Sequence, residues 1–89
     1  MADSLRRRKI TKEGYFQIIK SLTPSEYRVY EEMVKGYRAS EAAKRLNLKK
    51  TTVDSYLKVI YKKLDVGSIV EMIITYGPIY NVINTDELE

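Results

Sequence analysis

Hydrophobic residues recur along this chain with the three- and four-residue spacing of amphipathic helices. The clearest case is residues 48–66, where an apolar stripe repeats at i, i+4, i+7, i+8 and i+11: Val53, Leu57, Ile60, Tyr61 and Leu64. At about 100° per residue, the opposite side of such a helix is polar. It carries Thr51, Asp54, Ser55, Lys58 and Lys62. The pattern predicts a helix that buries one face and turns hydrogen-bonding and cationic side chains outward.

Capping signals and breaker residues divide the rest of the chain into further helices. Thr23 and Glu26 have the spacing of a capping box, and Pro24 suits the first helical position. No strand-like alternation of useful length is present, so we expect an all-α fold. The other expected helices are Thr11–Lys20, Thr23–Lys35 with a stop at Gly36, Ala39–Leu46, and one that Ser68–Glu71 opens and Gly77-Pro78 ends.

The segment just before residue 48 changes the interpretation of the polar face. Alone, such a face is typical of an ordinary solvated helix. The short helix Ala39–Leu46 precedes it, however, and only Asn47–Lys49 separate the two. Two helices joined by a tight turn, the second with a cationic face, are typical of a helix-turn-helix, whose second helix enters the major groove of DNA.

Composition limits the function classes. The 89 residues, 44% of them hydrophobic, predict one small domain with one core. The chain has no cysteine and no histidine, which excludes disulfides, thiolate or imidazole catalysis and the usual zinc or haem ligands. No acid–base pair or phosphate-binding glycine loop is evident, so we expect neither an enzyme nor a cofactor. Without a signal peptide or a membrane-length apolar run, we expect a cytoplasmic, nucleoid-associated protein with no membrane partner.

Charge is segregated along the chain, whose net charge is +4. Residues 1–20 contain six basic and two acidic residues, Lys49–Lys63 contains five lysines and one acid, and the C-terminal end is negative. Two basic segments on one small domain favour binding to a phosphate backbone.

The block from Leu22 to Ile73 resembles the LuxR/GerE family of bacterial DNA-binding domains. The resemblance rests on LTPSE at Leu22–Glu26, Val29, Gly36, EAAKRLNL at Glu41–Leu48 and TVDSYLKVIYKKLDV at Thr52–Val66. It implies a four-helix helix-turn-helix domain, here with an additional N-terminal helix, in which Lys50–Leu64 is the recognition helix. By position, the base-contact candidates are Asp54, Ser55 and Lys58, and the backbone-contact candidates are Lys49, Lys50, Thr51, Thr52 and Lys62.

Asp54 departs from the family, which commonly has a lysine there, and a carboxylate is repelled by phosphates. It could accept a hydrogen bond from cytosine N4 in the major groove. Alternatively, Thr51 and Asp54 have capping-box spacing, so Asp54 could help to begin the helix or favour its dipole. The sequence leaves both roles open.

The last helix carries more apolar residues than one face can hold. Ile69, Met72, Ile73 and Tyr76 fill a face toward the core, and Val70, Ile74 and Gly77 form a second face. The resemblance implies that a partner subunit covers this second face, so these three are the dimer-contact candidates. The alternative is that Ile79, Tyr80, Val82 and Ile83 of the same chain fold back over it.

The expected organisation is a basic arm at residues 1–10, the helix-turn-helix domain at 11–77 and a tail at 78–89. The run Arg6–Lys9 is either a solubilising end or a minor-groove arm. We expect a homodimeric, sequence-specific regulator of transcription that binds double-stranded DNA, of bacterial or phage origin, with RNA polymerase as a further candidate partner. No receiver or ligand-binding domain precedes the helices, so control by abundance or by a partner is expected. The alternatives are a module that docks on RNA polymerase or another regulator without specific DNA binding, and an RNA-binding role.

Overall fold

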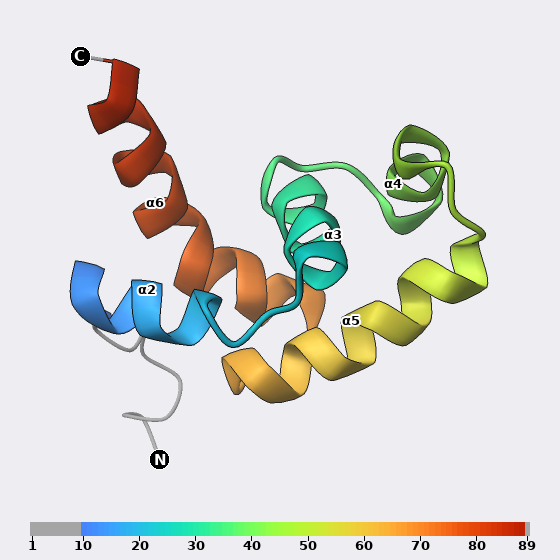
Figure 1. The fold of residues 1–89 in the computed structure, drawn as a ribbon, viewed down its shortest axis with the longest axis horizontal. Coiled ribbons are helices and arrows are strands. Elements are labelled where there is room, and N and C mark those ends of the chain that lie inside the picture. Colours follow the sequence, from blue (N-terminus) through green and yellow to red (C-terminus); the bar gives the residue numbers. More distant parts are fainter. Residues whose placement is uncertain (1–9, 89) are drawn as a thin grey trace.

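A computed structural model describes residues 10–88, which form helices and no strands. Figure 1 shows them in chain order: α2 (Lys12–Ile19), α3 (Pro24–Val34), α4 (Ala39–Leu46), α5 (Lys50–Leu64) and α6 (Ile69–Leu88). The predicted all-α fold, four helices preceded by an additional one, is confirmed. The basic run Arg6–Lys9 lies outside the described residues.

Local hydrogen bonds explain where the helices begin and end. At the start of α3, the Glu26 N–H donates to Thr23 Oγ1 at 3.2 Å, and the Thr23 N–H donates to Glu26 Oε1 at 2.9 Å, which is the predicted capping box. After α3, Gly36 has φ +103°, a left-handed conformation that favours glycine. At the start of α6, the Glu71 N–H donates to Ser68 Oγ at 3.2 Å, as the sequence predicted. The Glu71 carboxylate accepts from the Gly67 N–H instead of from Ser68.

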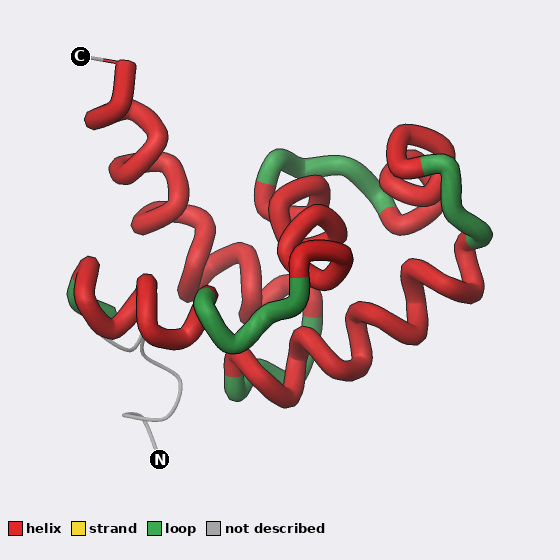
Figure 2. Tube along the Cα trace, viewed as in Figure 1, coloured by secondary structure: helices red, strands yellow, loops and turns green. Residues whose placement is uncertain are grey.

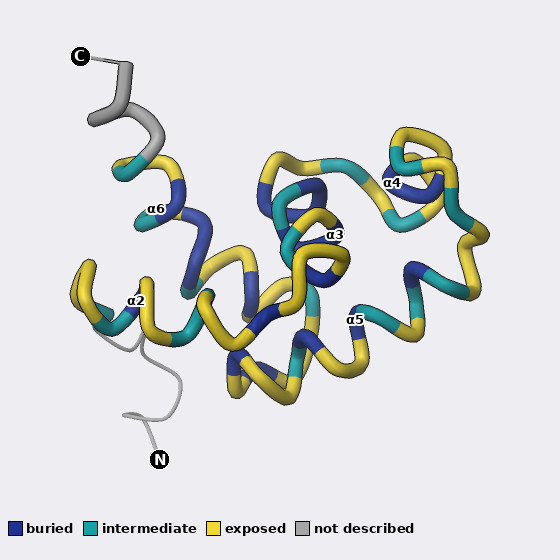
Figure 3. Tube along the Cα trace, in the orientation of Figure 1, coloured by how far each residue is buried: buried dark blue, intermediate teal, exposed yellow. Residues whose placement is uncertain are grey.

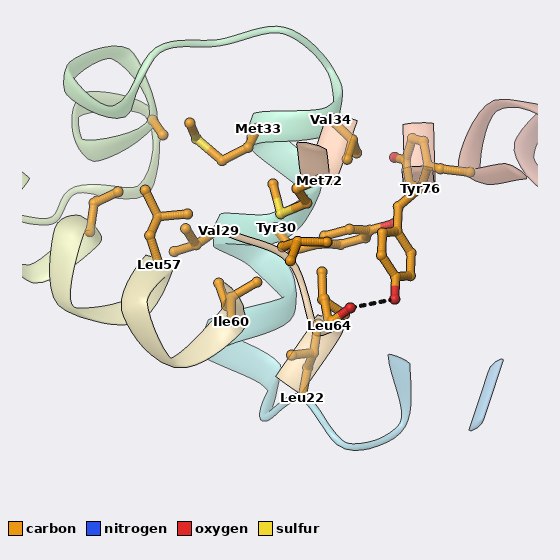
Figure 4. Packing of buried hydrophobic residues seen from close by; sticks show 14 of the residues in the cluster. Leu22, Val29, Tyr30, Met33, Val34, Leu57, Ile60, Leu64, Met72 and Tyr76 are labelled. Carbon is orange, nitrogen blue, oxygen red and sulfur yellow. Dashed lines mark hydrogen bonds between the residues drawn. The ribbon is translucent and has the colours of Figure 1, made fainter. Parts of the chain in front are cut away.

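The core lies where α3, α5 and α6 meet, with α4 against α3 and α5 (Figure 3). Figure 4 shows Val29 and Tyr30 of α3 packed among Ile60, Leu64 and Met72, and each of these five is fully buried. Burying such side chains stabilises a fold by about 1.5–3 kcal/mol each relative to leaving them exposed. The hydroxyl of buried Tyr76 donates to the Leu64 carbonyl at 2.7 Å, so α6 is tied to the end of α5.

The additional helix α2 is part of this core. Tyr15 is only 3% exposed, and its hydroxyl lies 2.9 Å from the Tyr30 hydroxyl. Burial raises the pKa of both tyrosines, so the two hydroxyls stay protonated and share a hydrogen bond at physiological pH. Phe16, the next residue along α2, is 49% exposed.

The predicted end of the last helix at Gly77-Pro78 is wrong, because α6 continues through Pro78 to Leu88. Proline removes one backbone hydrogen bond and costs about 3 kcal/mol inside a helix. Packing offsets this cost: Tyr80 is buried, its ring meets Tyr30 edge to face, and its hydroxyl donates to Glu31 Oε2 at 2.8 Å. The alternative in which the tail folds back over α6 is therefore also wrong. The C-terminal end of α6 projects from the other helices at the upper left of Figure 1.

Candidate nucleic-acid interface

The helix-turn-helix consists of α4, a turn at residues 47–49 and α5 (Figure 2). Asn47 ends α4 in a left-handed conformation, with φ 58°, and the Leu48 N–H donates to the Ala43 carbonyl at 2.8 Å. This pairing is the usual way in which a helix end satisfies its last carbonyls. The small side chains of Ala42 and Ala43 are buried, so α4 can approach its neighbours closely.

Packing fixes which side of α5 faces outward. Val53, Leu57, Ile60 and Leu64 are buried against the core, as the apolar stripe predicted. The opposite side is therefore open to solvent. Of the candidate DNA contacts, Thr52 and Asp54 are half-buried at the edges of this side, and the exposed ones are Lys49, Lys50, Thr51, Ser55, Lys58 and Lys62.

The structure gives Asp54 a partner that the sequence analysis did not consider. Lys50 Nζ lies 2.9 Å from Asp54 Oδ2, an i,i+4 ion pair with 59% and 43% of the two side chains exposed. An exposed pair of this kind contributes little to stability. Its effect is local, because it offsets the negative charge of Asp54 beside the polar face.

The capping alternative for Asp54 is wrong. The residue that precedes the helix is Lys49, and no side chain caps α5. Thr51 is already inside the helix, where it cannot act as the cap of a capping box. Asp54 is thus a side chain at the edge of the outward face.

Lys63, which belongs to the basic segment Lys49–Lys63, turns toward the segment that precedes α3 and the first turn of α3. Its Nζ donates to Glu26 Oε1 and to the Ser21 carbonyl, both at 2.8 Å. The hydrogen bond from Lys63, followed by that from the Thr23 backbone, lowers the pKa of Glu26. One lysine of five is therefore committed to the fold.

Three lysines of this segment remain available. For Lys49, Lys58 and Lys62, no ion pair is seen with any residue whose side chain the structure describes. They lie near the start, middle and end of α5. Their ammonium groups supply the positive charge that a phosphate backbone attracts.

Val59 was missed by the sequence analysis. It is 39% exposed, and it lies four residues after Ser55 and three before Lys62, on the outward face. The only available signal was its position outside the apolar stripe. An exposed aliphatic side chain here offers a surface for the methyl group of thymine.

The outer face of α6 is apolar and open. Val70 is 61% exposed, Ile74 49% and Ile73 37%, although Ile73 was predicted to face the core. Gly77 was predicted to lie on the open face, but it is buried within the chain. A Cβ atom added at Gly77 would lie 3.8 Å from Ile73 Cγ2 of the same helix. Gly77 therefore offers a partner little surface.

The described residues also bear on two other kinds of site. No group of three or more acidic, histidine or cysteine side chains that could hold a metal ion is found among them. No single helix in residues 10–88 has the length and apolar character to cross a membrane, and only α5 and α6 taken together, bent by 62°, meet those criteria.

Comparison with known proteins adds one finding. The family model GerE, described as bacterial regulatory proteins of the luxR family, matches residues 20–76, which is more than half of the chain. The match begins just before α3 and ends within α6, so it spans the helix-turn-helix. No curated protein and no solved structure matches the chain.

Proposed function

The chain belongs to the luxR family of bacterial regulatory proteins, which regulate transcription by binding DNA, and from this membership we propose that it recognises a specific duplex sequence as a homodimer. In this proposal α5 lies in the major groove and α6 contacts the partner subunit. The family is one of regulators and not of enzymes.

The outward face of α5 is the observation that carries the proposal. Short hydrogen-bonding side chains, and lysines that form no ion pair with a described side chain, occupy one side of a helix whose other side is buried in the core. Short polar groups suit base edges, and ammonium groups suit phosphates. We assign base contacts to Asp54, Ser55 and Lys58, and backbone contacts to Lys49, Lys50, Thr51, Thr52 and Lys62.

Asp54 and Lys50 act together in this assignment. The carboxylate of Asp54 has room to accept a hydrogen bond from cytosine N4, because it is only partly buried. Its partner Lys50 keeps the local charge near neutral, which reduces repulsion from the nearest phosphates.

The exposed apolar face of α6 supports the homodimer. Val70 and Ile74 lie one turn apart on this face, and both are about half exposed or more. A two-fold dimer would bury the same residues of both subunits and place two copies of α5 on paired half-sites.

Selection from a pool of random duplexes, combined with the mass of the protein in solution, tests the whole proposal. We expect enrichment of an inverted repeat and the mass of a dimer. If no sequence is enriched and the protein instead binds RNA polymerase or another regulator, the chain is an interaction module and the proposal fails.

Substitutions on α5 should separate base contacts from backbone contacts. Lys58→Ala and Ser55→Ala should change which sequences are bound, with about 1–3 kcal/mol lost at the preferred base pair for a direct contact. Lys62→Ala should weaken all duplexes about equally. Titrations against the selected and a scrambled duplex measure the difference, and equal losses on both duplexes for all three variants would refute the assignment.

DNA affinity should depend steeply on salt. If each subunit neutralises about three phosphates through residues such as Lys49, Lys50 and Lys62, the dimer's log affinity should fall against log salt with a slope near −5. Titrations at several salt concentrations give this slope. A slope near zero would mean that the basic face does not meet nucleic acid.

A further inference from the structure

A cleft of about 450 Å³ opens beside the outward face of α5. It lies between the end of α3, the connection that leads to α4, the part of α5 from Asp54 to Tyr61 and the start of α6. Gly36 lines it, and a Cβ added to Gly36 would meet no atom within 4 Å, so the connection leaves this space open. Clefts of this volume are typical of sites for small molecules.

The floor of the cleft is apolar. Met33, Leu57, Ile69 and Ile73 contribute to it from three different helices. Met33 and Leu57 are almost fully buried, whereas Ile73 keeps 37% of its surface exposed at the edge. Water over such a floor has few hydrogen-bonding partners, so an apolar group that displaces it is favoured.

The free charge at the rim is positive. Arg38 lines the cleft and is exposed, and no carboxylate that the structure describes forms an ion pair with its guanidinium. The nearby Glu41 carboxylate instead accepts the Arg38 backbone N–H at 2.7 Å. Among the described residues that line the cleft, the one acid is Asp54, which is already paired with Lys50. Arg38 can therefore take an external anion.

Two tyrosines, Tyr37 and Tyr61, also line the cleft. Burial, with a smaller contribution from Asp54, raises the pKa of Tyr61, so its hydroxyl stays neutral and can donate. The Tyr37 ring is covered by the Arg45 guanidinium, 4.1 Å from the ring centroid, and Arg45 pairs with Glu32 of α3. The Tyr37 ring is therefore held in place before any ligand arrives, which lowers the cost of binding against it.

We propose that this cleft binds a small amphipathic carboxylate, with the apolar body of the ligand over Met33, Leu57, Ile69 and Ile73 and its carboxylate against the guanidinium of Arg38. Guanidinium and carboxylate groups match in charge and in planar geometry. The cleft shares Asp54 with the proposed DNA contacts, but its existence does not rest on the proposed DNA function.

The test is a titration of the full chain with 4-phenylbutyrate, followed by NMR of the methyl groups. We expect saturable shifts at Leu57, Ile69 and Ile73, with a Kd on the order of 0.1–1 mM for a ligand of about a dozen non-hydrogen atoms. The matched ligand 4-phenylbutylamine has the same apolar body and the opposite charge. It should bind at least about 5-fold more weakly, since it meets Arg38 with a like charge.

Matched variants complete the test. Arg38→Gln should lower the affinity for 4-phenylbutyrate by about 5- to 10-fold, as expected for the loss of one charge-assisted contact at an exposed rim. The Arg38 side chain makes no capping hydrogen bond, so helical circular dichroism should be unchanged. Arg28→Gln removes an exposed arginine that does not line this cleft, and should leave the affinity unchanged.

The proposal would be overturned by shifts that do not saturate, by equal affinity for the amine, by full affinity in Arg38→Gln, or by shifts confined to exposed methyl groups elsewhere, such as those of Val59 and Val82. A second copy of the chain is the competing occupant, because Ile73 also borders the open face of α6. In that case the wild-type dimer would show no shifts at Leu57, and the proposal would fail.

Discussion

Ile74→Lys is expected to leave the helices intact, to convert a dimer into a monomer and to weaken binding to the selected duplex by on the order of 100-fold. Ile74 is 49% exposed in the isolated chain, so a lysine there disturbs no core contact. In a two-fold contact the same substitution occurs twice, and both charges would have to lose water. Monomers would then bind half-sites singly and lose the gain from linking two weak sites. Sedimentation, circular dichroism and duplex titration measure the three effects.

Val82→Lys is the matched control for this prediction. Val82 lies on the same helix with a similar exposure of 52%, but about two turns beyond the proposed contact. This variant should keep the wild-type mass and affinity. If the wild type is itself a monomer, or if Ile74→Lys unfolds, the dimer assignment is wrong.

Met72→Ala should destabilise the fold by about 2–5 kcal/mol, the range for removing a buried methionine side chain and leaving a cavity. Met72 is 0% exposed and packs among residues of α3 and α5 (Figure 4). Small domains have about 5–15 kcal/mol of stability, so this single change removes a large part of it. Thermal unfolding should show a midpoint lower by on the order of 10 °C or more.

Val82→Ala serves as the control for the core variant. It removes an aliphatic side chain from an exposed position of the same helix, and it should change stability by no more than about 0.5 kcal/mol. A small effect of Met72→Ala, similar to that of Val82→Ala, would mean that α6 does not pack on the core as described.

Local signals in the sequence accounted for most of the helix boundaries. The capping box at Thr23 and Glu26 and the glycine at position 36 act within a few residues, so their effect can be predicted without knowing the fold. The apolar stripe of α5 was equally informative, because 3.6-residue periodicity reports burial directly. The family resemblance, which the comparison confirmed, followed from the same segments.

The wrong predictions, for the end of the last helix and for Gly77, arose from contacts between residues that are distant in the sequence. Gly77-Pro78 is a strong local stop signal, yet Tyr80 and its partners Tyr30 and Glu31 extend the helix beyond it. Those partners lie about fifty positions earlier in the chain, where no local pattern points to them. The same reason explains why Gly77 was placed on an open face, since its burial depends on packing.

The site was predictable in outline and not in detail. Periodicity placed Ser55, Lys58 and Lys62 on one outward face, and the structure places them there. Periodicity could not distinguish Lys63, which is the immediate neighbour of Lys62 but turns toward Glu26 and Ser21. Which lysine pairs inward depends on a carboxylate 37 positions away.

The Lys63 contacts restrict the rotation of α5 about its own helix axis. A helix with its side chains is about 10–12 Å across, so a rotation of only ~30° would move the side-chain tips by roughly 3 Å, about the length of one hydrogen bond. Lys63 holds one flank of α5 to Glu26 and to the Ser21 carbonyl, and so resists such a rotation. Residues that never approach a base would thereby determine which base edges Ser55 and Lys58 can reach. With the proposed base contacts, changes at Glu26 or Lys63 would then alter which DNA sequence is preferred as well as how stable the fold is.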